Sequence, residues 1–395
     1  MRFPEFSGEW VKYRVSDFLE FYTTNSLSWD QLEYDSGECL NLHYGLIHNG
    51  LPVQVDLSKD TLPSIKADFF PKKYTLCQDG DIAFADASED TNDVGKAIEF
   101  YNCAGKDAVC GLHTIHGRDK LGITVPGFKG YVFSSKVFHD QIKTIAQGTK
   151  VFSIKASNFD EVVLGIPGKE EQKKISKLLM AIDERISAQS KIIEELTTLR
   201  SALIEKCSVQ SGDIYDLSEI LKEVDERSTV ANQHQVLSST VKGIFSQKEY
   251  FNKDIASEDN KGYKVVRRGQ VVLSPQNLWM GNINFNDRFD VGIVSPSYKV
   301  YSIRGGLNPM FIASLLRTKK ALYEYMLASE QGASIVRRNL NVEAFMAIKF
   351  RIPDSCQQNS LSMAIIAINA KLNNEQAILE RLIMQKSSLL DMMFI

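Results

Sequence analysis

The chain has 395 residues, of which 44 % are hydrophobic and 24 % charged, and its formal net charge is −3 at neutral pH. This composition excludes a mainly disordered chain, and the length allows two or three domains. Because there is no apolar run of about 18 residues and no apolar core at the N-terminus, we expect neither a membrane-spanning helix nor a signal peptide.

Charge is distributed unevenly along the chain. Residues 1–93 hold 7 Lys and Arg against 17 Asp and Glu, whereas residues 261–351 hold 14 against 5. A local positive excess favours a polyanion such as DNA even when the whole chain is acidic. The alternative is a chance clustering of charges on a solvated face.

The cysteines are too widely spaced to form a recognisable framework. No two of them make a CxxC pair, which argues against a zinc site and against a disulfide framework. We therefore expect reduced thiols in a cytoplasmic protein. The six positions are Cys39, Cys77, Cys103, Cys110, Cys207 and Cys356.

Residues 1–167 are expected to form a first globular domain of short strands and a few helices. A strand-like run at Gly80-Asp81-Ile82 leads into the acidic loop 86–96. Polar groups alternate from His113 to Lys120, and His/Asp pairs there suggest a metal site, but no third ligand lies at a usual spacing, so we expect no metal. Contact with bases or phosphates is the stronger hypothesis, and its candidates are Lys96, His113, Thr114, Arg118 and Lys120.

Residues 168–208 are expected to form a long helix. Pro167 ends a strand-like run, and the 39 residues from Lys169 to Cys207 contain neither Gly nor Pro. Apolar residues step along it by four and three, which is typical of a coiled-coil seam. Two polar residues, Gln189 and Arg200, interrupt this seam. Its apolar positions are Ile175, Leu179, Ile182, Ile186, Ile193, Leu196 and Leu203.

Residues 209–353 are expected to form a second globular domain. The strand-like run 263–273 leads into a loop, 274–282, whose Gln and Asn side chains can pair with adenine edges. Two arginines near residue 337 can read guanine or anchor phosphate. The alternatives are an ordinary polar loop with a packed Trp279, and solvated salt bridges. The DNA-contact candidates here are Gln276, Asn277, Asn282, Arg337 and Arg338.

Residues 354–395 repeat the first helix at an offset of 186 residues. Of the 41 pairs from Ile166–Lys206 and Ile352–Met392, 11 are identical without a gap. The seam recurs, with Glu375 and Lys386 at the matching polar places, so we expect the two helices to pair as a coiled coil. The alternative is a helix packed on its own domain, which would show a wider apolar stripe. The second seam is Leu361, Ile365, Ile368, Leu372, Leu379, Leu382 and Leu389.

The motifs of common catalytic centres are absent. The sequence has no GxxxxGK[ST] nucleotide-binding loop, no GxSxG or HExxH motif, and no Asn-Pro-Pro-aromatic signature of adenine methyltransferases. A non-catalytic binding subunit therefore fits best. Two rivals stay open: a coiled-coil scaffold whose domains bind ligands or proteins, and an enzyme, such as a stand-alone nuclease, whose active site has gone unnoticed.

The repeated pattern of Ile-Pro, Glu-Gln and a long heptad helix resembles the specificity subunit of type I restriction-modification enzymes. Its first copy runs from Ile166-Pro167 through Glu171-Gln172 to Ile186, and the opening Arg2-Phe3-Pro4-Glu5-Phe6 is also similar. The second copy has Cys356-Gln357 four residues after Ile352, a departure to which we attach no loss of function.

The resemblance implies two α/β target-recognition domains, each reading one half of a split, asymmetric DNA site, and helices that form an antiparallel coiled coil. It also implies two methylation subunits, which carry S-adenosylmethionine and flip an adenine for N6-methylation, and two ATP-dependent restriction subunits. The S-adenosylmethionine, ATP and Mg²⁺ are expected on those partners, with no cofactor in this chain.

Overall fold

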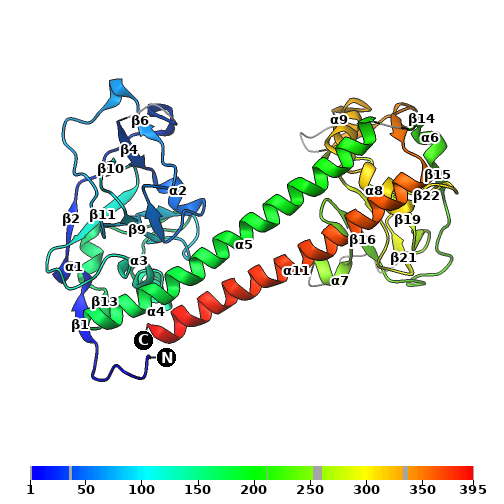
Figure 1. Cartoon of the computed structure of the whole chain (residues 1–395). Helices are drawn as coiled ribbons and strands as arrows, with labels where there is room; N and C mark the ends of the chain where they lie inside the picture. The colour runs from blue at the N-terminus through cyan, green and yellow to red at the C-terminus, as the bar shows by residue number, and fades with distance from the viewer. Residues whose placement is uncertain (1, 35–37, 211, 252–259, 332–336, 395) are drawn as a thin grey trace. The chain divides into compact units, whose positions relative to one another are not determined.

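The computed structural model describes residues 2–34, 38–210, 212–251, 260–331 and 337–394. The chain divides into two compact units, Met1–Ser190 with Ala377–Ile395, and Lys191–Gln376. Each unit holds one globular domain and part of two long helices, α5 (Lys169–Gln210) and α11 (Ser355–Met393) (Figure 1). We call the globular part before α5 domain 1 and the part between α5 and α11 domain 2.

Domain 1 is built from short strands and a few short helices. Its strands are β1 (Val11–Arg14), β2 (Leu19–Tyr22), β3 (Leu32–Glu33), β4 (Cys39–Leu42), β5 (Gln54–Asp56), β6 (Ser64–Ile65), β7 (Ile82–Ala85), β8 (Ala87–Ser88), β9 (Ala97–Tyr101), β10 (Asp107–Cys110), β11 (Thr114–Asp119), β12 (Phe152–Ser153) and β13 (Val163–Ile166). Its helices are α1 (Val15–Phe18), α2 (Tyr44–His48), α3 (Lys129–Val132) and α4 (Lys136–Ile145), with 3-10 turns η1 (Trp29–Gln31), η2 (Ala67–Phe69) and η3 (Ala156–Asp160). The larger sheet has the strand order β2-β11-β7-β9-β5, and a second sheet has the order β10-β4-β6-β3.

Domain 2 is built in the same way. Its strands are β14 (Asp213–Asp216), β15 (Leu221–Val224), β16 (Leu237–Thr240), β17 (Gly243–Ser246), β18 (Lys264–Arg267), β19 (Gln270–Leu273), β20 (Ile283–Phe285), β21 (Val291–Val294), β22 (Lys299–Ile303), β23 (Ser329–Gln331), β24 (Arg338–Leu340) and β25 (Lys349–Ile352). Its helices are α6 (Leu217–Ile220), α7 (Gln247–Phe251), α8 (Pro309–Leu315), α9 (Lys319–Leu327) and α10 (Val342–Met346), with the 3-10 turn η4 (Leu278–Met280). The main sheet has the strand order β15-β22-β19-β20.

The repeat seen in the sequence is also a repeat of topology. In each domain the first strand pairs antiparallel with the last, β1 with β13 and β14 with β25. The strand orders β2-β11-β7-β9 and β15-β22-β19-β20 match position by position. The turn before β7 and the turn before β19 each place a glycine, Gly80 and Gly269, at a positive φ of 84° and 87°. The prediction of two similar α/β domains and two long helices is confirmed.

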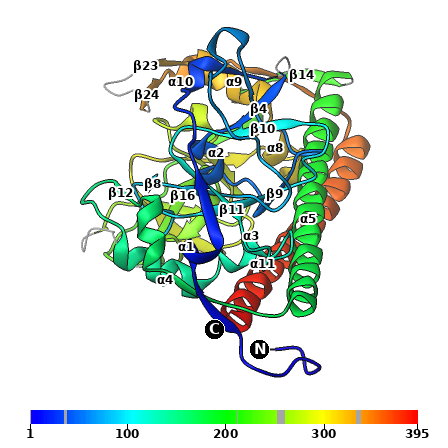
Figure 2. The ribbon, with the colours of Figure 1, turned by 90° about the vertical axis from the view of Figure 1, so that its left-hand side faces the viewer.

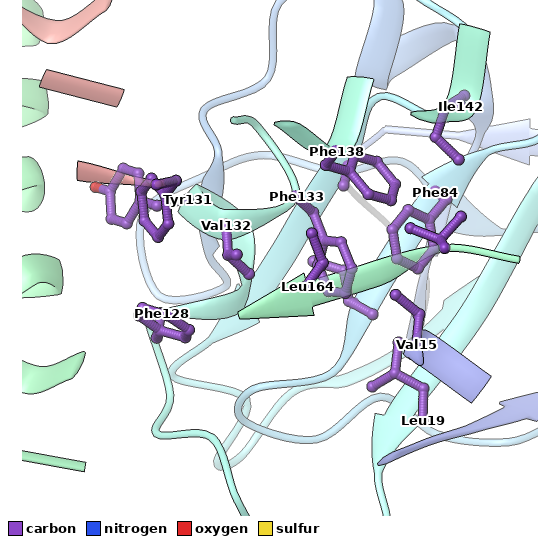
Figure 3. Close-up of a cluster of buried hydrophobic side chains, with 14 of the residues drawn as sticks. Val15, Leu19, Phe84, Phe128, Tyr131, Val132, Phe133, Phe138, Ile142 and Leu164 are labelled. Carbon is purple, nitrogen blue, oxygen red and sulfur yellow. The ribbon is translucent and has the colours of Figure 1, made fainter. Parts of the chain in front are cut away.

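The core of domain 1 is rich in aromatic side chains. Phe84 from β7 packs edge-on against Phe133, with ring centroids 4.8 Å apart, and Phe133 contacts Phe138 at 5.0 Å (Figure 3). All three are fully buried. The same cluster includes Ile175 and Leu179 from the start of α5, so this end of the helix is part of the domain core.

A buried glutamine joins each long helix to its domain. Gln172 accepts the backbone N–H of Val125 (2.9 Å) and donates to the carbonyl of Pro167 (2.8 Å). Gln358, its counterpart in the repeat, accepts the N–H of Asn308 and donates to the carbonyl of Pro353, both at 2.8 Å. Because each amide satisfies a backbone group at a turn, the Gln of the repeated motif has the same structural role twice.

The two long helices pair in opposite directions. In the first unit, Lys386 of α11 lies 2.6 Å from Asp183 of α5, and Leu389 joins the cluster that contains Leu179. The carboxyl end of α11 therefore lies beside the amino end of α5 (Figure 2). In the second unit, Arg200 near the carboxyl end of α5 donates to Asn369 in the first half of α11 (3.1 Å). These contacts confirm the antiparallel coiled coil.

Two of the polar residues that interrupt the seam, Arg200 and Lys386, each bind a polar side chain of the other long helix within their own unit. Every apolar seam position is buried or half-buried, whereas Leu199 and Ile366, next to seam positions, are 55 % and 49 % exposed. The side chain of Cys207 and the segment Ser334–Val336 lie outside the described residues. No helix among the described residues contains an apolar stretch that is long enough to cross a membrane.

Candidate nucleic-acid interface

The first candidate surface lies at one end of the five-stranded sheet of domain 1. β7 ends at Ala85 and its antiparallel neighbour β11 begins at Thr114, and these two residues are paired. The N–H of Ala85 also donates to the carbonyl of Lys96 (2.9 Å), and that of Asp86 to the carbonyl of His113 (3.1 Å). The structure thus brings together Lys96, His113 and Thr114, which with Asp86 we call the domain 1 edge.

His113 presents an accessible imidazole at this edge. Its side chain is 49 % exposed, and its Nδ1 lies 3.0 Å from Asp86 Oδ1. Its backbone φ is +54°, in the left-handed region, so the chain turns sharply just before β11. An imidazole held in this position can hydrogen-bond to a base edge or to a phosphate oxygen.

A series of ring contacts that leads from His113 to Trp29 was missed in the sequence. The ring of Tyr44 lies 5.1 Å from that of His113, His43 lies 4.8 Å from Tyr44, and Trp29, 44 % exposed, lies 4.4 Å from His43. Burial lowers the pKa of His43, and electrostatic repulsion from His113 lowers it further. The Nδ1 of His43 accepts the N–H of Gly45. Trp29 is the exposed ring of this group, and an exposed aromatic ring offers a face on which a base can stack. No sequence periodicity links these positions, so only the fold reveals the group.

Three of the five candidates of domain 1 make internal contacts. Thr114 is buried and donates to the carbonyl of Gly111 (2.6 Å). Arg118 donates twice to Asp81, at 2.8 and 2.6 Å. Burial opposes ionisation of Asp81, but hydrogen bonds from Arg118 and from a histidine hold its pKa below the usual value. Lys120 donates to a backbone carbonyl (3.0 Å). Because six-residue β11 spans about 20 Å, Arg118 and Lys120 lie towards its other end, away from the domain 1 edge.

The second candidate surface lies at the equivalent end of the sheet in domain 2. The loop 274–282 follows β19 in domain 2, and the acidic loop 86–96 follows the equivalent strand β7 in domain 1. The N–H of Arg338 donates to the carbonyl of Gln276 (3.1 Å), which joins two segments 62 residues apart that the sequence suggested separately. Gln276 and Arg337 are exposed. We call Gln276, Asn277 and Arg337 the domain 2 edge.

Three of the five domain 2 candidates have inward-facing polar groups. Asn282 is buried, accepts from the hydroxyl of Ser239 (2.8 Å) and donates to its carbonyl (3.0 Å). The guanidinium of Arg338 donates to the hydroxyl and the carbonyl of Ser329, at 2.9 and 2.6 Å. Asn277 is half-buried, and its Oδ1 has no hydrogen-bond partner within the described residues. The side chains of Asn282 and Arg338 therefore stabilise domain 2, and a role of the three residues in DNA contact stays a prediction.

A polar cavity of about 660 Å³ lies in the second unit. It runs between the carboxyl part of α5, the β16–β17 turn and the helices α8 and α9. Its charged lining is mainly basic, which suits phosphate oxygens. The sequence did not single out this group, because four separate segments supply it. The charged residues are Arg200, Lys242, Arg317 and Lys319, with Glu205 and Asp287.

The sequence matches no protein-family model and no curated protein. Its structure is similar to that of the type I restriction-modification S subunit from M. genitalium, with a TM-score of 0.56 and 14 % identity over 98 % of this chain and 96 % of that one. A chain of a type I R-M system, from a study of complex assembly and conformational transition, matches with a TM-score of 0.56 and 11 % identity over 97 % of both chains. The chain has the fold of a type I restriction-modification S subunit.

Ion pairs in domain 2 change the interpretation of the basic stretch 261–351. Many of its cations form ion pairs with acidic residues that lie outside it, so much of its positive excess is neutralised within domain 2. Examples are Arg267 with Glu226 (2.6 Å), Arg288 with Glu249 (3.0 Å) and Lys299 with Glu223 (2.8 Å). The solvated salt bridges considered for this stretch are therefore real for these residues, and candidates for phosphate contact are better sought in the polar cavity.

Proposed function

We propose that this chain is the DNA-recognition subunit of a type I restriction-modification complex. Domains 1 and 2 each read one half of a split, asymmetric site through their sheet edges, and the paired helices fix the unread spacer. The observation that carries the proposal is the S-subunit fold over almost the whole chain. The repeated topology supports it, because two copies of one domain suit two half-sites.

The chain itself is proposed to be non-catalytic. Two methylation subunits would supply S-adenosylmethionine and flip the target adenine, and two restriction subunits would supply ATP-dependent cleavage with Mg²⁺. The match to a chain from a type I R-M system studied for its assembly supports such partners. The domain 1 and domain 2 edges would then direct where the partners act.

Methylome mapping tests the proposal. The chain is co-expressed with the methylation subunit of its system, and N6-methyladenine is mapped across the host genome. The expected result is one new split motif, methylated on opposite strands in its two halves. A purified complex that yields no new motif contradicts DNA recognition by this chain. Absence of any complex as well would favour the scaffold alternative.

Substitution of Arg337 by alanine tests the domain 2 edge. If Arg337 reads a base, the loss costs about 1–3 kcal/mol of binding and relaxes one position of the motif; if it contacts a phosphate, all sequences bind more weakly to the same extent. The complex with methylation subunits is titrated with cognate and single-mismatch duplexes in a fluorescence anisotropy assay.

Arg304→Ala is the matched control for Arg337→Ala. Arg304 is an exposed arginine of the same domain, and it follows β22 at the end opposite the domain 2 edge. We expect it to leave affinity and motif unchanged. Equal effects of the two substitutions would show that charge alone matters and would remove Arg337 from the edge.

A further inference from the structure

Two cysteines and a histidine meet in the interior of domain 1. The candidate ligand atoms of Cys77, Cys110 and His116 all lie within 4.8 Å of one another. The three residues are 6 %, 3 % and 1 % exposed. They come from the segment before β7, the end of β10 and the middle of β11, and their spacings match no regular metal motif, so nothing in the sequence groups them.

The distance between the two sulfurs suits a shared metal ion. Cys77 Sγ and Cys110 Sγ lie 3.7 Å apart. Two thiolates bound to one tetrahedral zinc at about 2.3 Å each are separated by about 3.8 Å. A disulfide would need about 2.05 Å, so the observed pair is not bonded.

The histidine is oriented as a metal ligand is. Its Nε2 lies 2.8 Å from Asp81 Oδ2, and Asp81 is itself held by two hydrogen bonds from Arg118. Its Nδ1 is buried and has no hydrogen-bond partner among the residues that the structure describes. A carboxylate on one imidazole nitrogen and a free second nitrogen are the usual arrangement of a metal-binding histidine.

Domain 2 shows that the fold does not need these polar groups. The turns at Gly80 and Gly269 align the segments before β7 and β19, and the strand pairings align β11 with β22. The bridge of Leu76 with Val109 corresponds to the pairing of Val265 with Ile293. By this alignment Cys77, Cys110 and His116 correspond to Val266, Val294 and Val300.

The three valines are fully buried and belong to one hydrophobic cluster with Val272. The same place is therefore filled by aliphatic packing in one domain and by two thiols and an imidazole in the other. Burial of a polar group costs free energy unless a partner compensates it, so the domain 1 cluster needs a reason that packing does not supply.

We propose that domain 1 binds one zinc ion through Cys77 Sγ, Cys110 Sγ and His116 Nδ1, with Asp81 orienting the imidazole. Two thiolates and an imidazole form a donor set that zinc prefers, and water can fill the fourth tetrahedral position. The ion would anchor the connection from β10 to β11, which carries His113 and leads into Thr114, both of the domain 1 edge. This proposal does not depend on the proposed function.

Metal analysis of the purified full chain tests the proposal directly. The chain is stripped of metal under reducing conditions, incubated with Zn²⁺ alone, separated from unbound metal and analysed by plasma mass spectrometry. The expected result is one zinc per chain, with a higher melting temperature than the stripped chain has. With Co²⁺ in place of Zn²⁺, we expect thiolate charge-transfer absorption and the visible bands of a tetrahedral site.

Three variants assign the ligands. The triple change Cys77→Val, Cys110→Val and His116→Val copies the packing of domain 2, and we expect it to fold and to bind no zinc. Asp81→Asn is expected to weaken zinc affinity about 10–100-fold while the cobalt–thiolate absorption stays. Cys39→Ser is the matched control, because Cys39 is also buried (2 % exposed) but lies outside the cluster, and it should bind zinc as the wild type does.

Measurements on the wild-type chain alone can contradict the proposal, so the test does not depend on the folding of the variants. A stripped and reloaded chain that retains no zinc contradicts it. So does a disulfide between Cys77 and Cys110, detected by peptide mapping of the native protein. Zinc retained equally by the triple variant would place the ion elsewhere in the chain and would also contradict it.

Discussion

Replacement of Glu99 by alanine is expected to destabilise domain 1 by about 3–5 kcal/mol, because it leaves the buried ammonium group of Lys129 without its anionic partner. Glu99 in β9 is fully buried and accepts the N–H groups of Gly127 (2.9 Å) and Gly130 (2.8 Å). Its carboxylate lies 3.5 Å from Nζ of Lys129, which is 3 % exposed. The substitution therefore unpairs one cation and two backbone donors.

Urea denaturation measures this effect in the full chain. Trp10 and Trp29 lie in domain 1 and the third tryptophan, Trp279, lies in domain 2, so a Trp279→Phe background makes the fluorescence report on domain 1. Glu161→Ala, at an exposed glutamate of the same domain, should stay within about 0.5 kcal/mol of the parent.

The double variant Glu99→Ala, Lys129→Ala distinguishes the effect of the lost ion pair on stability from the other destabilising effects of the substitutions. Removing both charges eliminates the unpaired cation, so the double variant should be less destabilised than the sum of the two single variants. A purely additive result, or a loss below about 1 kcal/mol for Glu99→Ala, would contradict a coupled buried pair.

Replacement of Leu179 by alanine is expected to cost about 2–5 kcal/mol, since it opens a cavity in a close-packed core. Leu179 is a seam position of α5, is fully buried, and belongs to the cluster that includes Phe128 and Leu389. The same change therefore weakens the core of domain 1 and the contact between α5 and the end of α11.

Leu199→Ala is the matched control for Leu179→Ala. It is the same substitution in the same helix, but Leu199 is 55 % exposed and lies off the seam. We expect it to change stability by no more than about 0.5 kcal/mol. Both variants are measured by urea titration in the chain that keeps Trp279, so that fluorescence reports on both domains. Similar losses at the two positions would mean that helix propensity and not burial determines the effect, which would contradict the seam.

The helices could be predicted well because their signal is local. The steps of three and four residues place the seam on one face of a helix whatever the rest of the chain does. The Ile-Pro and Gln motif likewise acts within its own turn: Gln172 and Gln358 each donate to the carbonyl five residues earlier. The repeat then predicted two similar domains without any knowledge of how each is folded.

The sites were harder to predict because the residue type of a polar side chain does not determine whether it is buried or exposed. Asn282 and Arg338 have the chemistry of base readers, yet their polar groups face Ser239 and Ser329 inside domain 2. Gln276 and Arg337 carry the same amide and guanidinium groups and are exposed. Which member of each pair faces inward depends on how distant segments pack.

The heptad helices, the internal repeat and the mixed α/β class of the domains could be predicted from the residues, since each follows from periodicity or from similarity between segments. Which side chains meet depends on the packing of the folded chain. Cys77, Cys110 and His116 share one interior site, and Trp29, Tyr44 and His113 share one surface, because strand pairing brings together segments that no spacing in the sequence relates. Strand order and register act over long distances in the chain, and they set these neighbours.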